Sequence, residues 1–277
     1  MRPAPTAPAP QVLRRRRLVA VAAGGVVAVL TAAAIDVVRD RTAPAATASV
    51  GEAGIDESQA TTERPWVWDQ PPTAATPLPI APAVAPVITR VDTTDPVVFL
   101  TVDDGVTRDQ AGREAFTALG IPASLFLVDQ PIQDAAAWFG GLPGAMVESH
   151  SRTHPDMRTL GEAAQRDEIC GNADLIESTY GRRPVLFRPP YGNYDGATQR
   201  AAAACGMRAI VLWQVNVNGH IVGFREVPRF RPGDIILMHF RPSFVQELHV
   251  IRDRVEQAGL HFALLEDYLA PDTRPPR

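Results

Sequence analysis

Three short segments of the chain contain the residue types that hydrolysis at a metal ion requires. They read TVDDG at 101–105, HSRTH at 150–154 and LMH at 237–239. Together they supply two adjacent carboxylates, two imidazoles four residues apart and one late histidine. Metal-assisted hydrolysis needs ligands for the ion, a base that takes a proton from water and an acid that protonates the leaving group. The combination therefore indicates a hydrolase with a single metal ion.

The two carboxylates, Asp103 and Asp104, directly follow an apolar run and precede Gly105. Active sites of α/β proteins lie at the C-terminal ends of parallel strands. Neighbouring side chains of a regular strand point to opposite faces, so both aspartates can serve one site only if the backbone turns there, as Gly105 permits. The alternative is a pair of aspartates that cap the helix after the strand.

His150 and His154 also follow an expected strand, and on a helical turn their spacing would place both on one face. Two histidines and one carboxylate suit Zn²⁺, with positions left open for water and substrate. The alternative is two surface or capping histidines. This alternative is disfavoured because the chain has only six histidines, and two of them lie close together downstream of the Asp-Asp pair.

Two further segments follow expected strands. In RPPYG at 188–192 the prolines stiffen the loop and Gly192 allows a sharp turn, so a backbone N–H can face a developing oxyanion. Arg188 can pair with a carboxylate and fix its orientation. His239 ends a run of apolar residues, which indicates a side chain directed into a site. The alternatives are an ordinary turn with a salt bridge and a histidine that belongs to the core.

With these motifs the sequence resembles the NodB-type polysaccharide deacetylases, carbohydrate esterase family four. The motifs of that family read approximately TFDDG, HS/TxxH, RxPYG, a Trp–Asp segment and LxH. This chain has TVDDG, HSRTH, RPPYG, WQVN at 213–216 and LMH in the same order. The resemblance covers roughly residues 95–268 and implies a distorted, incomplete (β/α) barrel.

The resemblance implies a role for each matched position. Asp104, His150 and His154 would bind one divalent metal, most simply Zn²⁺, with Co²⁺ or a similar ion as the alternative. Asp103 would be the general base for water, and Arg188 would hold it.

The remaining matched positions would act on the substrate. His239 would protonate the leaving amine, and the backbone N–H of Tyr191 would stabilise the oxyanion. Leu237 would line the acetyl pocket, and Trp213 would belong to the same substrate region.

The fourth motif departs from the family pattern, because Asn216 stands where an aspartate is expected. In the family, an aspartate of this motif charges and orients the catalytic histidine, and an amide cannot stabilise an imidazolium by charge. We therefore expect either a lower pKa for His239 than is usual in the family or a substitute partner, for which Asp234 and Glu266 are candidates. Val102 and Val106 also replace the usual Phe and Pro, as packing changes.

The N-terminal region has the composition of a targeting segment followed by a spacer. A basic segment at 1–17 ends in Arg14–Arg17, and the apolar run 18–35 would span roughly 27 Å as a helix. We expect 18–38 to be a transmembrane anchor or a cleaved signal peptide, and either places the rest outside the cytoplasm. The Ala/Pro/Thr-rich stretch 39–94 is expected to be a disordered linker, in which Trp66 and Trp68 can pack on the following domain.

From residue 95 the pattern becomes that of an α/β domain, which we expect to reach 270, with a tail at 271–277. Apolar runs predict strands at 97–102, 123–128, 145–147, 184–187, 208–213 and 234–238. Helices are expected at 108–119, 160–180, 196–204 and 242–258. This alternation predicts parallel strands, in a number too small for eight βα units. Cys170 and Cys205 fall on successive helices, and an extracytoplasmic location allows a disulfide without requiring it.

These features predict a metal-dependent N-deacetylase that acts on an acetylated glycan of the cell surface, such as peptidoglycan or a related N-acetylglucosamine polymer. Two alternatives stay open: a metal- and glycan-binding module without turnover, and an O-acetyl esterase on the same scaffold. The net charge of −4 argues against nucleic acid as a partner, and the membrane would be a partner only through an uncleaved N-terminal helix. No protein partner can be inferred.

Overall fold

The computed structural model describes residues 64–73 and 77–273 of the chain. The expected basic segment at 1–17, the anchor or signal peptide at 18–38 and the first part of the linker lie outside the described residues. Among the helices that are described, none combines the length and the apolar character needed to cross a bilayer. The described residues all belong to one compact unit, Gln59–Arg277.

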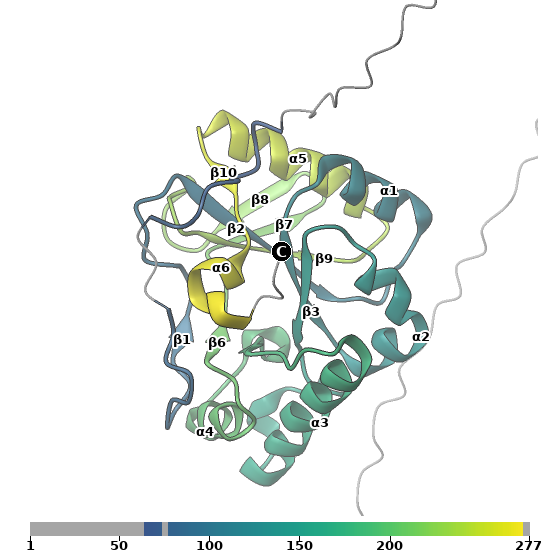
Figure 1. Cartoon of the computed structure of the whole chain (residues 1–277), viewed down its shortest axis with the longest axis vertical. Helices are drawn as coiled ribbons and strands as arrows, with labels where there is room; N and C mark the ends of the chain where they lie inside the picture. The colour runs from purple at the N-terminus through teal and green to yellow at the C-terminus, as the bar shows by residue number, and fades with distance from the viewer. Residues whose placement is uncertain (1–63, 74–76, 274–277) are drawn as a thin grey trace, which may run out of the picture. The chain divides into compact units, whose positions relative to one another are not determined.

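A curled, mostly parallel sheet forms the centre of this unit (Figure 1). Its middle strand, β2 (Val97–Asp104), lies between β3 (Ala123–Leu127) and β9 (Ile235–His239). The remaining strands are β1 (Val87–Ile88), β4 (Ala145–Ser149), β5 (Leu186–Phe187), β6 (Ala209–Val211), β7 (Val215–Asn218), β8 (Ile221–Phe224) and β10 (His261–Phe262). The order β1-β6-β5-β4-β3-β2-β9-β7-β8 does not close on itself, and β10 pairs with the start of β2. The expected incomplete barrel is therefore confirmed.

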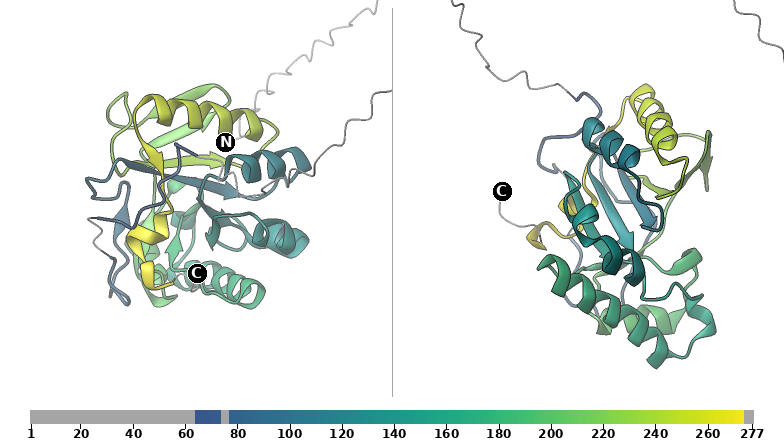
Figure 2. Two further views of the ribbon diagram at one scale, coloured as in Figure 1. Left: turned by 45° about the horizontal axis from the view of Figure 1, so that its top comes forward. Right: turned by 90° about the vertical axis from the view of Figure 1, so that its right-hand side faces the viewer.

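Helices follow the strands around the outside of the sheet, as the views in Figures 1 and 2 show. They are α1 (Gln110–Leu119), α2 (Asp129–Gly140), α3 (Glu162–Tyr180), α4 (Gly196–Ala204) and α5 (Phe244–Gln257). All four helices expected from the sequence are present, and α3 ends at Gly181 with a left-handed φ of 73°. The sequence analysis did not expect α2, which lies between the apolar runs 123–128 and 145–147 and contains Pro131. A proline in the first turn is tolerated, since the N–H groups there have no partner within the helix.

Both faces of β2 are buried, which explains why its first four residues, Val97–Leu100, are all apolar. Val98, Leu100 and Val102 pack toward α1 and α5 on the outside. Val97 and Phe99 face the inside, where the short helix α6 (Leu265–Leu269) covers them. Side-chain alternation therefore directs Thr101 and Asp103 into the interior of the half-barrel.

The expected linker ends earlier than predicted, because its described part, 64–73 and 77–94, packs on the domain. Trp66 donates its indole N–H to the carbonyl of Leu119 at 3.0 Å, and the Trp68 backbone N–H donates to Phe262 at 2.8 Å. Further along, β1 pairs with β6. The two tryptophans pack on the domain as expected, and Leu78, Ile88 and Val91 of the same stretch also pack against its core.

A disulfide joins α3 to the end of α4. Cys170 and Cys205 are bonded, with their Cα atoms 4.9 Å apart. The sequence left this pairing open, and the side-by-side packing of the two helices decides it.

The disulfide closes a loop of 35 residues, so its removal should cost about 4 kcal/mol of unfolding free energy by loss of the constraint on the unfolded chain. Urea unfolding of a Cys170→Ala/Cys205→Ala variant measures this loss. A reductant should lower the midpoint of the unmodified protein and leave the variant unchanged. Equal midpoints for the fully reduced and oxidised protein would contradict the prediction.

Candidate active site

The backbone turns sharply at the end of β2, and this turn brings two neighbouring aspartates to one site. Asp103 continues the inward-facing row of the strand, whereas Asp104 has a left-handed φ of 72° and Gly105 one of 83°. A Cβ at Gly105 would lie 2.8 Å from the Phe139 ring, so glycine is required for packing as well as for conformation. The turn was expected from Gly105, and the structure begins it one residue earlier.

The segment 150–154 is a loop rather than the helical turn that the i, i+4 spacing suggested. Ser151 and His154 adopt left-handed φ values of 71° and 61°, and the rings of His150 and His154 are 5.0 Å apart. The proximity expected for the two imidazoles is present, but the loop backbone produces it.

Two residues of α3 hold this loop. Asn172 accepts hydrogen bonds from the Ser149 hydroxyl at 2.7 Å and from the backbone N–H of His150 at 3.2 Å. One turn earlier, Glu168 accepts from the backbone N–H groups of Arg152 and Thr153, both at 2.9 Å. The sequence analysis missed both residues, although their i, i+4 spacing on a helix directs them to the same side.

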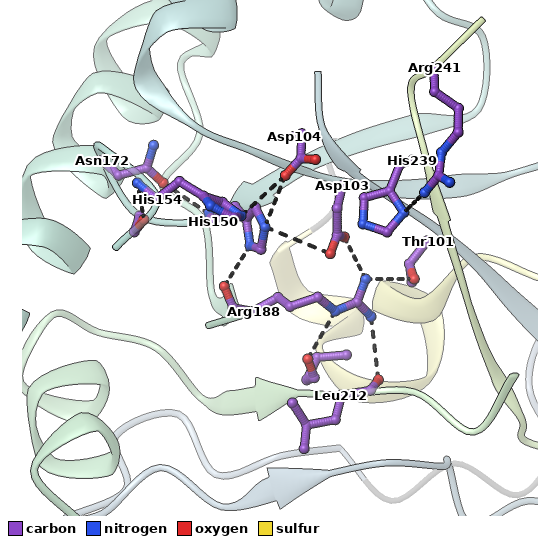
Figure 3. Close-up of polar contacts among 12 residues, drawn as sticks. Thr101, Asp103, Asp104, His150, His154, Asn172, Arg188, Leu212, His239 and Arg241 are labelled. Carbon is purple, nitrogen blue, oxygen red and sulfur yellow. Dashed lines mark hydrogen bonds and ion pairs between the residues drawn. The ribbon is translucent and has the colours of Figure 1, made fainter. Parts of the chain in front are cut away.

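Asp104, His150 and His154 form a cluster with the composition of a metal site (Figure 3). Asp104 Oδ1 lies 3.3 Å from His150 Nε2 and 3.4 Å from His154 Nε2, and this buried oxygen has no hydrogen-bond partner among the described residues. The Nδ1–H of His150 donates to the Arg188 carbonyl at 2.7 Å, which leaves the Nε2 lone pair for a ligand bond. The orphaned oxygen and the oriented imidazole fit a divalent cation such as Zn²⁺.

The charges of these groups are also suited to a cation. Burial opposes ionisation of Asp104, yet the His150 imidazole beside it keeps the pKa of that carboxyl below its ordinary value. Burial opposes a charge on His150 as well, yet Asp103 and Asp104 raise the pKa of that imidazole. Burial, aided by the charge of His150, lowers the pKa of His154, so its imidazole stays neutral at neutral pH. An ionised carboxylate and neutral imidazoles are the forms that bind metal, so a bound cation would displace the proton that the two carboxylates favour on His150.

Arg188 holds Asp103 from below, as Figure 3 shows. Its side chain is fully buried, and Nη1 donates to Asp103 Oδ1 at 2.6 Å and to the Thr101 hydroxyl at 2.7 Å. Further donations reach the carbonyls of Val211 and Leu212, so the guanidinium is satisfied on several sides. The other carboxylate oxygen, Asp103 Oδ2, faces the Asp104, His150 and His154 cluster and lies 3.7 Å from His150 Nε2.

The RPPYG loop borders the cluster. Tyr191 has a left-handed φ of 61° and is 65% exposed, and its ring packs edge-on against the His154 ring with the two centroids 4.7 Å apart. Gly192 lies so close to Trp213 that a Cβ would be 2.9 Å from the indole ring. Trp213 therefore supports this loop, and Leu237 is buried opposite Thr101 in the sheet register.

All non-glycine residues with left-handed φ in the described part of the chain belong to these loops. They are Asp104, Ser151, His154 and Tyr191. Such conformations cost free energy and persist where the surroundings impose them. Their restriction to the motif loops indicates that strain is used to position the site.

His239 lies opposite Asp103 in the β2–β9 register, and its other side contacts an arginine. Arg241 Nη2 is 2.6 Å from His239 Nδ1, and Arg241 Nη1 donates to the Asn218 side-chain oxygen at 2.9 Å. Burial lowers the pKa of His239, the charges of Arg241 and His150 lower it further, and Asp103 and Asp104 oppose them. The sequence analysis expected such a lowering or a substitute partner, and it missed Arg241.

Neither carboxylate suggested as the partner of His239 makes that contact. Asp234 accepts a hydrogen bond from the backbone N–H of Arg231 at 2.8 Å, and Glu266 accepts from the Ser124 hydroxyl at 2.8 Å. Burial beside Glu148 raises the pKa of Glu266 to about 8. Both were wrong candidates, because proximity in the fold, not residue type, decides the partner.

The buried Arg188–Asp103 pair should be costly to break from one side. Arg188→Met leaves a buried carboxylate without its partner and should lower the unfolding free energy by roughly 3–5 kcal/mol. The double variant Arg188→Met/Asp103→Leu should recover part of that loss. As a control, Arg183→Met removes exposed ion pairs and should cost no more than about 1 kcal/mol. Equal losses for Arg188→Met and Arg183→Met in denaturant unfolding would contradict this assignment.

Comparison with known proteins shows what this arrangement belongs to. The family model described as polysaccharide deacetylase matches residues 90–210. An uncharacterized protein of Streptomyces coelicolor is 39% identical over 192 residues, which cover 66% of this chain and 77% of that protein. A bifunctional xylanase/xylan deacetylase of Cellvibrio japonicus is 35% identical over 34% of this chain and 15% of its own length. A peptidoglycan-N-acetylglucosamine deacetylase of Bacillus cereus is 24% identical over 44% and 48% of the two chains.

Solved structures share the fold. A family 4 carbohydrate esterase from Streptomyces lividans, in complex with acetate, is 26% identical with a TM-score of 0.54, over 62% of this chain and 93% of that one. A family 4 pseudoenzyme from Bacillus anthracis has a TM-score of 0.57 at 21% identity, over 66% and 68% of the two chains, and shows the fold alone. The chain thus belongs to the polysaccharide deacetylase family, the NodB-type proteins of carbohydrate esterase family four.

Proposed function

We propose that the protein is a metal-dependent deacetylase of polysaccharide outside the cytoplasm. The observation that carries this proposal is the position of Asp103. Its carboxylate is buried and held by Arg188, while its second oxygen is directed to the Asp104, His150 and His154 cluster. A fixed carboxylate beside a cation site is the arrangement that water activation requires.

The residues of the site would have separate roles in the reaction. Asp104, His150 and His154 would hold the divalent cation, which supplies a Lewis acid for the acetyl carbonyl and lowers the pKa of water. Asp103 Oδ2 would take a proton from the attacking water, because Arg188 fixes the other oxygen of that carboxylate. His239, on the neighbouring strand opposite Asp103, would assist departure of the leaving group.

The Tyr191 loop would complete the substrate side of the site. Its backbone would contribute to oxyanion stabilisation, and the exposed Tyr191 ring beside His154 would contact the sugar. Leu237 would line the space for the acetyl methyl group. The left-handed backbone at Tyr191 supports this role, since it sets the orientation of the neighbouring peptide groups.

The substrate class follows from the family and from the expected location. The resemblance favours N-acetyl groups, and the name of the Bacillus cereus relative points to N-acetylglucosamine in peptidoglycan. The name of the Cellvibrio japonicus relative points to acetyl groups on xylan. A targeting segment at 18–38 would deliver the domain to the cell surface, as an anchored or a secreted protein, where such polymers occur.

A binding module without turnover is the alternative. It was motivated by the missing aspartate in the fourth motif, and the family includes the pseudoenzyme noted above. The presence of Asp103, Arg188 and the complete ligand set in contact with one another favours turnover.

The proposal predicts a specific metal requirement. His154→Ala should weaken Zn²⁺ binding by roughly 100-fold or more, because loss of a ligand exceeds the 10–100-fold cost of losing an outer hydrogen bond. Isothermal titration of the metal-free protein measures this. His249→Ala is the matched control, since that imidazole is exposed on α5 and outside the cluster. Equal affinities of the two variants would exclude the proposed ligand set.

The proposal also separates metal binding from turnover. Asp103→Asn should reduce acetate release from acetylated glycan by roughly 10²–10⁴-fold, because an amide cannot take the proton from water. The same variant should bind Zn²⁺ with nearly unchanged affinity, since Asp103 is not in the ligand set. Acetate release by Asp103→Asn at the unmodified rate would refute the role of base. A binding module would show Zn²⁺ uptake and no acetate from any acetylated glycan.

A further inference from the structure

We propose that Arg241 is a positioning residue that fixes His239 as a neutral imidazole with its proton on Nε2, and that it thereby favours an oxygen over a nitrogen leaving group. The proposal rests on the deacetylase function and narrows its substrate class to O-acetyl esters of sugars. It departs from the N-acetyl substrates that the family resemblance favours.

The hydrogen bond between Arg241 and His239 can have only one direction, with arginine as the donor. A guanidinium has N–H donors and no acceptor. Arg241 Nη2 is 2.6 Å from His239 Nδ1, so Nδ1 must accept this hydrogen bond with its lone pair. The ring then carries its proton on Nε2. Protonation of Nδ1 would set two N–H donors against each other at that distance.

Arg241 is also held in place on the side of its guanidinium away from His239. Its Nη1 donates to the Asn218 side-chain oxygen at 2.9 Å at the end of β7. The next residue, Gly219, donates its N–H to the buried carboxylate of Glu247 on α5 at 2.7 Å, and Ser243 donates to the same oxygen at 2.8 Å. The β7–β8 turn is therefore tied to α5, and it holds the guanidinium against His239.

Charges of both signs surround His239. Asp103 and Asp104 at the end of β2 favour a positive ring, while burial, Arg241 and His150 oppose it. The balance lowers the pKa of His239, in agreement with the polarity of the hydrogen bond. Figure 3 shows the ring between Asp103 and the Arg241 guanidinium. In place of a carboxylate that would stabilise an imidazolium, this chain presents a cation.

The consequence concerns the bond that breaks. In either substrate, the water oxygen bonds to the acetyl carbon and Asp103 takes a proton from that water. With an amide, the C–N electron pair goes to nitrogen, which departs only after full protonation, and a neutral imidazole is a poor acid for this. With an ester, the C–O pair goes to the sugar oxygen, which departs as an alkoxide under a hydrogen bond from Nε2–H. The proton held by Asp103 then returns to that oxygen to give a free hydroxyl, and the acetic acid that is formed loses the remaining water proton to solvent and leaves as acetate.

The tautomer is tested directly on the full chain loaded with Zn²⁺ and labelled with ¹⁵N-histidine. The His239 signals are assigned by their loss in His239→Gln. We expect protonated Nε2 and unprotonated Nδ1 at neutral pH. Arg241→Lys should retain this state because lysine also only donates, whereas Arg241→Glu should move the proton to Nδ1. A mixture of tautomers or an imidazolium at neutral pH in the unmodified protein would overturn the proposal.

Leaving-group preference is tested on matched β-1,4 oligomers, one O-acetylated on glucose and one N-acetylated on glucosamine. The ratio of kcat/KM for ester over amide should fall at least roughly 10-fold in Arg241→Glu, because an acid-competent His239 then serves the amide. Arg241→Met is a second variant, and its ratio should also fall. Arg254→Ala, an exposed arginine at the end of α5, is the matched control and should change neither rate.

The outcomes of the two tests are distinguishable. A ratio that Arg241→Glu and Arg241→Met leave unchanged overturns the role of Arg241 while the deacetylase function stands. No acetate from either oligomer, with metal bound, overturns the proposed function, and the ¹⁵N spectra still decide whether Arg241 fixes the tautomer. Circular dichroism of each variant separates these results from a failure to fold.

Discussion

The site depends on the buried ion pair between Arg188 and Asp103. Removing a guanidinium from water costs several kcal/mol, and the structure offsets this by giving it a carboxylate, a hydroxyl and two carbonyls as partners. The pair links the end of β2 to the loop after β5 and to β6. The backbone carbonyl of the same arginine accepts from His150. One residue thus orients both the expected base and an expected metal ligand.

Around this pair, parallel strand register does most of the positioning. β2, β3, β4 and β9 end at one edge, so the residues that follow them meet without long excursions of the chain. The final adjustment comes from left-handed backbone at the strand ends, as at Asp104 and His154. These conformations are strained for residues with a side chain, and hydrogen bonds from Asn172 and Glu168 on α3 maintain the histidine loop.

In this chain an arginine, and not a carboxylate, contacts the histidine that lies opposite Asp103. Here Asp103 and Asp104 lie on one side of His239 and Arg241 on the other. The ring is therefore held between opposite charges, and the direction of its hydrogen bond follows from the donor-only chemistry of arginine. A single contact of this kind leaves the fold unchanged and alters which leaving groups the site can serve.

The sequence by itself determined the alternation of apolar runs and helices, the incomplete barrel and the residues of the Asp104, His150 and His154 cluster. Buried parallel strands and strand-end motifs are local patterns, and they survive without knowledge of the fold. Only the tertiary structure decided the loop conformation of His150–His154, the β7–β8 hairpin, the supports at Asn172 and Glu168, the disulfide and the partner of His239. These features depend on distances between segments far apart in the chain, such as α3 and the loop after β4. Residue type and spacing do not encode such distances.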